Sequence, residues 1–585
     1  MLSEKLFRCM KPEKDLTMDS LSVALRKEIN LNAPWDLIEK FAHQHREKPE
    51  DVNRGAEIIG NALKAHDIPV TMHAPELFLS LPGDASIEAN GVRYAAKPPA
   101  FCASMPEGIE AALIYVAEAS GGTPLDRNPS TSNGNVTGKI AVIEGFALPN
   151  FVAGLESAGA SGVIAVNPGE MIHWGTVSTI WGTPEPADLA HLPRIPSAAV
   201  NQEDGQKLIA LAKSGGRACI RTNLETGWFK QKMPVVEIPG SETTQEFILL
   251  HGHYDSWREG VGDNGTGNAC MLEVARVLWN NRDKLKRSVR LAWWAGHSTG
   301  RYGGSAWFAD TFAIDLDENC VAHMNCDSPG CRWATDYSNI SCMSETERFV
   351  QKVVTDVTGQ QTKRKRPQRN SDYTFNNIGI SACFMASSMM TGEKRAEKGY
   401  YTVGGCGGNI AWHTEADTID IADRDVLAKD IALYLEAVTS LANAEILPFD
   451  WRATAAEFSA TIAEYEKAAG DRFDLSAAAN AIKALSFVLD NLYGAMENGT
   501  IDKQTANPVL KGLARIMVPI NYTRCPRFTH DPALNVPPLP AIAEAASLDG
   551  VPPDQMGFVT TKLLRGRNRI VAALREATRL VESAL

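Results

Sequence analysis

Four short and almost wholly apolar segments between residues 246 and 387 restrict the possible folds of this chain more than any other feature. They read EFILLHGHYD, SVRLAWWAG, CVAHMNCD and ISACFMAS, and the helix-like segment NACMLEVARVLWNN separates the first two. Apolar strands of this kind are typical of a mainly parallel sheet whose two faces are both covered by helices. We therefore predict an α/β fold built on a mainly parallel central sheet.

The length of the chain indicates more than one domain. Its 585 residues exceed what a single hydrophobic core usually organises. Short strands and helices, among them TGKIAVIEG and SGVIAVN, predict a compact β/α module inserted at residues 121–232, and the pattern becomes helical after Pro448. We predict that residues 1–120 and 233–447 form one α/β domain and that residues 448–585 form a helical domain.

Composition disfavours several classes of partner. The formal charge of −12 opposes nonspecific binding to nucleic acid, and no segment has the run of about 20 apolar residues that a membrane span needs. Charges interrupt the first residues, which predicts no export signal, and eleven scattered cysteines without any CxxC pair are typical of reduced thiols. We expect a cytoplasmic protein with no nucleic-acid and no membrane partner.

Polar side chains gather where the predicted strands stop. The set comprises His251, His253, Asp255, Asp263, Asp327 and His413. Ligands of open α/β sheets bind outside the carboxyl ends of the strands, and imidazole with carboxylate is what a borderline cation such as zinc prefers. Each residue alone is better explained by a structural hydrogen bond, but together they predict a metal site at this edge of the sheet.

Several motifs carry a family resemblance. HGHYDSW, VGDNGTG, RLAWWAGHSTGRYGGSAWF, NCDSPG and WHTEADT resemble, in order and spacing, the zinc aminopeptidase and glutamate carboxypeptidase family. The inserted module resembles a protease-associated domain, and the helical tail resembles the dimerisation domain of the transferrin-receptor-like branch. The resemblance implies a metal-dependent, peptidase-like hydrolase that acts on a small or short peptide-like substrate and forms a homodimer through the helical domain.

The resemblance also assigns roles to residues of the predicted site. It implies that His253 and Asp327 hold one divalent transition-metal ion, that Asp263 bridges to a second ion, and that zinc is the favoured metal. His413 would hold the second ion. Asp255 would orient the His253 imidazole from behind. His251 has no family role, and we interpret it as structural.

The chain departs from the family directly after WWAG. The family has two adjacent glutamates there, the first a general base and the second a metal ligand, whereas this chain has His297 and Ser298. With Ser298 in place of a carboxylate, two dications would face only Asp263 and Asp327, which favours one firmly bound ion. His297 would act either as an additional metal ligand or as the base, because imidazole titrates near neutrality.

This departure leaves three hypotheses for the function. The first is a hydrolase of an amide or related C–N bond that is not a standard peptidase. The second is a metal-dependent lyase or cyclase on the same scaffold, and the third is a catalytically inactive, receptor-like binding protein.

A second group of residues is expected to line the cleft. Arg369 follows a basic run and is interpreted either as part of a solvated loop or, with Arg366, as a contact for an anionic substrate. The segment RNSDYTFNNIGIS resembles the family's substrate-facing segment, and Cys406 lacks a neighbouring partner for a role as nucleophile. The further candidates for contacts with substrate are Ser298, Asn370, Ser371, Asp372, Tyr401 and Trp412.

Overall fold

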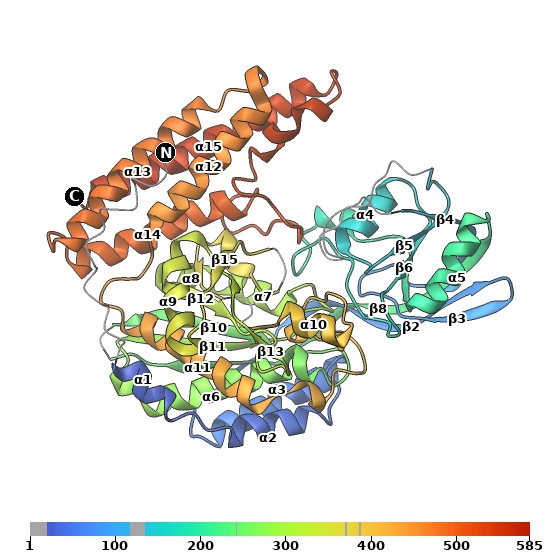
Figure 1. Cartoon of the computed structure of the whole chain (residues 1–585), viewed down its shortest axis with the longest axis horizontal. Coiled ribbons are helices and arrows are strands. Elements are labelled where there is room, and N and C mark those ends of the chain that lie inside the picture. The colour runs from blue at the N-terminus through green and yellow to red at the C-terminus, as the bar shows by residue number, and fades with distance from the viewer. Residues whose placement is uncertain (1–19, 118–134, 242, 369–370, 385–387) are drawn as a thin grey trace.

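The computed structural model describes residues 20–117, 135–241, 243–368, 371–384 and 388–585. Figure 1 shows three parts: an α/β body that holds the central sheet, a second sheet that extends to one side, and a group of long helices on the other side. The prediction of an α/β fold with an inserted β/α module and a C-terminal helical region is confirmed.

The central sheet has six strands in the order β1-β9-β11-β10-β12-β16. Its four strands from β11 to β16 are parallel, and β9 and β1 extend it antiparallel at one edge. The strands are β1 Thr71–His73, β9 Met233–Ile238, β10 Thr243–His253, β11 Arg287–Trp294, β12 Cys320–Asn325 and β16 Ser381–Ala382.

Helices cover both faces of this sheet, which is why its strands are apolar on both sides. The helices α6 Thr266–Asn280 and α11 Arg424–Asn443 contact one face, and α7 Gly303–Thr311 and α8 Ala313–Asn319 lie on the other (Figure 1). Ile248, Leu249 and Leu250 of β10 are fully buried. Burial of each such side chain contributes about 1.5–3 kcal/mol.

The parallel register brings the ends of the strands to one level. His253 of β10 lies beside Trp294 of β11, and His251 lies beside Asn325 of β12. The residues that directly follow these three strands therefore emerge at the same edge of the sheet. This edge is where ligands bind in open α/β folds.

The second sheet has seven strands in the order β3-β2-β8-β4-β5-β6-β7 and spans residues 76–230, which we call the inserted module. The predicted boundary at residue 121 falls inside this sheet, because β2, β3 and β4 precede it and pair within the module. The elements are β2 Glu76–Ala89, β3 Val92–Ala96, β4 Met105–Tyr115, β5 Ile140–Glu144, α4 Pro149–Ser157, β6 Gly162–Val166, β7 Ser197–Val200, α5 Gln202–Lys213 and β8 Arg217–Lys230.

The C-terminal region consists of long helices that pack on one another. They are α12 Trp451–Ala469, α13 Ser476–Glu497, α14 Lys503–Tyr522 and α15 Met556–Glu582. Arg515 of α14 docks the region on the α/β body, since its guanidinium donates to the carbonyls of Gly379 and Cys320. The strip after α14 also touches the inserted module, where the Ala533 amide donates to the Thr179 carbonyl at 2.7 Å.

Among the described residues, no helix combines the length and the apolar character that crossing a membrane requires. No disulfide joins any two of the ten cysteines within the described ranges.

Candidate metal centre

Asp263 lies between two histidines that are far apart in the sequence. Its Oδ1 is 3.1 Å from Nε2 of His253, and its Oδ2 is 3.2 Å from Nε2 of His413. Nε2 of His253 is buried and makes no well-aligned hydrogen bond. One carboxylate thus faces two imidazole nitrogens, which is the arrangement expected of a group that bridges two cation positions.

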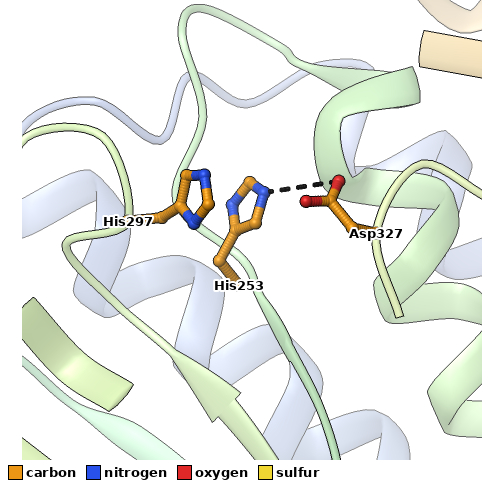
Figure 2. Close-up of side chains that lie close together, drawn as sticks. All are labelled: His253, His297 and Asp327. Atoms are coloured by element: carbon orange, nitrogen blue, oxygen red, sulfur yellow. Dashed lines mark ion pairs between the residues drawn. The ribbon is translucent and has the colours of Figure 1, made fainter. Parts of the chain in front are cut away.

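His297 and Asp327 complete the cluster around His253. Figure 2 shows His297 on one side of the His253 ring and Asp327 on the other. The two imidazoles are stacked with 3.9 Å between centroids, and Oδ1 of Asp327 lies 3.8 Å from Nε2 of His253. One ligand atom from each of the three residues falls within 4.8 Å of the others. Three side chains that follow three neighbouring strands are therefore close enough to share one cation.

Each of the three histidines is held through Nδ1. His253 donates to the Asp255 carbonyl at 2.9 Å, His413 to the Trp174 carbonyl at 3.0 Å, and His297 to the Asp372 carboxylate at 2.8 Å. These oxygens can only accept, so Nδ1 carries a proton in each ring, and in the neutral form of the ring Nε2 carries the lone pair. This is the tautomer that a metal ligand or a proton acceptor at Nε2 requires.

The electrostatics of the cluster favour a positive charge between the carboxylates. Burial disfavours the imidazolium of His253, but Asp263 and Asp327 outweigh it and raise the His253 pKa well above its usual range. Burial likewise opposes ionisation of Asp263, yet His253 and His413 hold its pKa well below the ordinary value. The donor set of imidazole and carboxylate fits a borderline divalent cation such as zinc.

Two further carboxylates hold the backbone of the cluster. Asp417 accepts the amides of Gly262 and Asp263 at 2.6 and 2.9 Å, and burial raises its pKa to about 7. Asp255 accepts the amide of His297 at 2.9 Å. The structure differs here from the sequence prediction: the Asp255 carbonyl, and not its carboxylate 3.7 Å away, is the partner of His253 Nδ1.

Asp372 lies beneath His297. Its Oδ2 accepts from the imidazole, and its Oδ1 accepts from the Ser305 hydroxyl at 2.6 Å. Burial opposes its ionisation, but His297 holds its pKa below the usual value. Asp372 is fully buried, so it supports His297 from behind and does not line the cleft as the sequence suggested.

The cluster opens into a cavity of about 590 Å³ between all three parts of the chain. Predicted residues on its wall are Asp263, His297, Ser298, Asp327, Ser371, Trp412 and His413. Arg301 and Tyr302 also line it, although sequence reasoning did not select them. Both have a positive φ, of 48° and 71°, a backbone conformation that concentrates at functional sites and leaves no trace in residue type.

Other predicted residues lie away from the cavity or outside the described ranges. His251 is fully buried and pairs with His323 Nδ1 at 3.0 Å, a structural role. Arg366 binds Glu457 and the carbonyl of Asn521, so it does not reach the cavity. Cys406 is buried, and its thiol donates to Asp417. Tyr401 meets the inserted module through His173. Arg369 and Asn370 lie outside the described residues.

Comparisons with known proteins find matches for two of the three parts of the chain. Residues 235–438 match the model of Peptidase family M28, and residues 109–208 match that of the PA domain. Leucine aminopeptidase 2 of Trichophyton equinum is 27% identical over 306 residues, which cover 51% of this chain and 57% of that protein. Carboxypeptidase Q of Rattus norvegicus is 30% identical over 125 residues, 20% of this chain and 26% of that protein.

The match to Leucine aminopeptidase 2 thus spans little more than half of that protein's length. Among solved structures, a zinc aminopeptidase from Bacillus subtilis aligns with a TM-score of 0.52 and 18% identity, over 70% of this chain and 95% of its own. That likeness shows the fold alone. The fold and the two matched regions lead to one conclusion: residues 235–438 of this chain carry a Peptidase family M28 domain, and a PA domain is inserted ahead of it at residues 109–208.

Proposed function

We propose that this protein is a metal-dependent hydrolase that cleaves an amide or related C–N bond of a small, peptide-like substrate, with His297 as the proton acceptor in place of a carboxylate. The observation that carries the proposal is the pair of His297 with Asp372, 2.8 Å apart, at the wall of the cavity. The peptidase names of the relatives support substrates of this type.

The residues that would hold the cation are His253 and Asp327, with Asp263 as the bridge and His413 at a second position. Their free Nε2 atoms and carboxylate oxygens converge on one end of the cavity. A bound divalent cation, for which zinc is our proposal, would polarise the carbonyl of the substrate and lower the pKa of water.

The role of His297 follows from its two ring nitrogens. Because Nδ1 donates to Asp372, Nε2 is free to take a proton from the attacking water and to return it to the leaving nitrogen. The Asp372 carboxylate keeps the ring in this tautomer and stabilises the imidazolium that forms. Burial of Asp372 strengthens the interaction, since water does not screen it.

We propose metal ligation as a second role for His297. Its ring stacks on His253, and its ligand atom lies within 4.8 Å of those of His253 and Asp327, so it is also placed to ligate the first cation. A neutral nitrogen would add a ligand without adding charge. With Ser298 at the neighbouring position, the site supplies only the charges of Asp263 and Asp327, which favours one firmly bound ion over two.

Metal analysis combined with kinetics tests the proposal. The purified protein is assayed for bound metal and for turnover of a library of dipeptides, N-acyl amino acids and simple amides, before and after chelation. We expect turnover that chelation abolishes and the metal restores. His297→Ala should keep the cation and lose turnover if His297 is the base, or lose both if it is a ligand.

The exposed His43 offers a matched control, because His43→Ala makes the same change at a residue outside the cluster and the cavity wall. It should keep both metal and turnover. A wild-type protein that binds no divalent cation, or that turns over amides equally well after chelation, would refute the proposal.

A further inference from the structure

The loop of the inserted module at residues 172–175 reaches across to the loop that carries His413. The Trp174 amide donates to the His413 carbonyl at 2.9 Å, and the Trp174 carbonyl accepts from His413 Nδ1 at 3.0 Å. One residue of the module therefore holds both the backbone and the ring of His413. The tautomer and the direction of this imidazole depend on a part of the chain outside the M28 domain.

His173 makes a second link between the same two loops. Its Nδ1 lies 2.6 Å from the Trp412 carbonyl, and its Nε2 lies 2.8 Å from the Tyr401 hydroxyl. A neutral imidazole satisfies both partners, since Nδ1 donates to the carbonyl and Nε2 accepts from the phenol. Burial lowers the His173 pKa to about 3, which keeps the ring neutral.

Aromatic and charged side chains close the interface around this pair. Trp412 stacks on His413 with 3.8 Å between ring centroids, and Trp174 stacks on Trp257 of the α/β body at 5.8 Å. The Lys97 ammonium lies 3.4 Å above the Trp174 ring and also binds Glu415 at 2.7 Å. The module therefore binds the His413 loop through hydrogen bonds, ring stacking and an ion pair.

The backbone conformation of His413 explains why neighbouring groups must hold this loop in place. Its φ of 58° lies in the left-handed region, which costs a residue with a side chain about 1–3 kcal/mol unless neighbouring groups hold it. The hydrogen bonds supply that restraint on both sides of His413: His173 binds the carbonyl of the peptide before it, and Trp174 binds the carbonyl of the peptide after it.

We propose that the inserted module is a working part of the metal centre: Trp174 through its backbone, and His173 through Trp412, are positioning groups that aim His413 at Asp263. Cation binding at His413 and docking of the module on the α/β body are then coupled, and each must strengthen the other by the same factor. This inference rests on the proposed role of His413 as a ligand.

The test uses the full chain, cobalt(II) as the probe and His173→Phe as the variant. Phenylalanine keeps the aromatic volume and removes both hydrogen bonds of His173. Loss of a direct hydrogen-bond partner of a ligating histidine typically weakens metal binding about 10–100-fold, and because His173 acts one residue away, through Trp412, we expect a loss of about 10-fold, at the lower end of this range. We expect this loss in the second and weaker cation equivalent, the one that involves His413, together with a change in its visible absorption, while the firmly bound equivalent at His253 and Asp327 is unaffected.

The same substitution at an exposed histidine of the module, His191→Phe, is the matched control and should leave both the titration and the spectrum unchanged. If His173→Phe fails to fold, Tyr401→Phe removes only the outer hydrogen bond of His173 and should weaken binding by a smaller factor. A folded variant with wild-type cobalt affinity and spectrum would overturn the inference, whereas a wild-type protein that binds no cobalt would overturn the proposed function instead.

Hydrogen exchange supplies the reciprocal measurement. Added cation should slow exchange of the Trp174 amide, which bonds to His413, and leave strand β8 of the module unchanged. Equal exchange at Trp174 with and without cation, in a protein that titration shows to be loaded, would contradict the coupling.

Discussion

Replacement of Asp372 by asparagine tests the role of His297 most directly. A chain of hydrogen bonds runs toward this carboxylate: Trp181 Nε1 donates to Thr374 Oγ1 at 3.1 Å, Thr374 lies 2.7 Å from Ser305 Oγ, and Ser305 donates to Asp372 Oδ1. An indole nitrogen can only donate, so each hydroxyl in this series donates toward Asp372. An asparagine at position 372 would therefore place its oxygen toward the Ser305 hydroxyl and its NH₂ toward His297.

That NH₂ would donate to His297 Nδ1 and move the ring proton to Nε2. His297 would then have no lone pair facing the cavity. A positioned general base contributes about 10²–10⁴-fold to the rate, and the corresponding change in a Ser-His-Asp triad costs about 10⁴-fold. We expect Asp372→Asn to lower kcat by about 10²–10⁴-fold, which equals about 3–5 kcal/mol of transition-state stabilisation.

The assay is steady-state kinetics on the best amide substrate, with metal content measured on the same preparation. Ser305→Ala is the control: it removes the other hydrogen bond of Asp372 but keeps the carboxylate at His297, so kcat should fall by less than about 10-fold. Asp372→Asn with wild-type kcat and wild-type metal content would refute the reasoning. Loss of the metal in this variant would assign His297 to the ligands.

Three further predictions concern stability, metal binding and assembly. Burial raises the pKa of Glu345 to about 7 from an ordinary 4.5, so the folded protein retains a proton there that the unfolded chain releases. The free energy of unfolding is therefore highest below pH 4.5 and falls by about 3 kcal/mol as the pH rises from there through about 7. Urea unfolding curves should show this fall for the wild type and not for Glu345→Gln. Asp263→Asn should weaken zinc binding, measured by calorimetry, more than about 100-fold at both cation positions, because loss of a metal ligand weakens binding more than loss of a hydrogen-bond partner of a ligand. The same substitution at the exposed Asp310 should leave zinc binding unchanged. We also propose a homodimer through the helical domain, where Phe487 and Phe558 are 67% and 78% exposed; sedimentation should show a dimer that Phe558→Glu weakens, and a monomeric wild type would contradict it.

Local pattern was sufficient for the central sheet because its strands are buried on both faces. EFILLHGHYD, SVRLAWWAG and CVAHMNCD became β10, β11 and β12 almost as predicted. The start of the inserted module could not be predicted from local sequence pattern. Its first strand, β2, pairs with β8 over residues 76–88 and 219–230, a contact between distant segments that no local periodicity reports.

The residues of the candidate site also differ in whether the sequence alone could indicate them. His253, Asp263, Asp327 and His413 stand at strand ends or in motifs, so the sequence could suggest that they converge, and the structure brings them together. The partner of His413 could not be found, because a backbone carbonyl at Trp174 carries no signal in residue type. Asp417 lies within WHTEADT and was open to prediction from the motif, but its function of holding two backbone amides depends on the fold.

The chemical nature of the three Nδ1 partners separates the histidines by role. His253 and His413 donate to neutral carbonyls, which set the tautomer but add no charge that would favour a protonated ring. A metal ligand must remain neutral, so a neutral partner suits it. His297 alone of the three donates to a carboxylate, and that carboxylate is fully buried. A buried anion at Nδ1 stabilises the imidazolium that forms when a histidine gains a proton at Nε2. The two kinds of partner therefore favour His253 and His413 as ligands and His297 as the base.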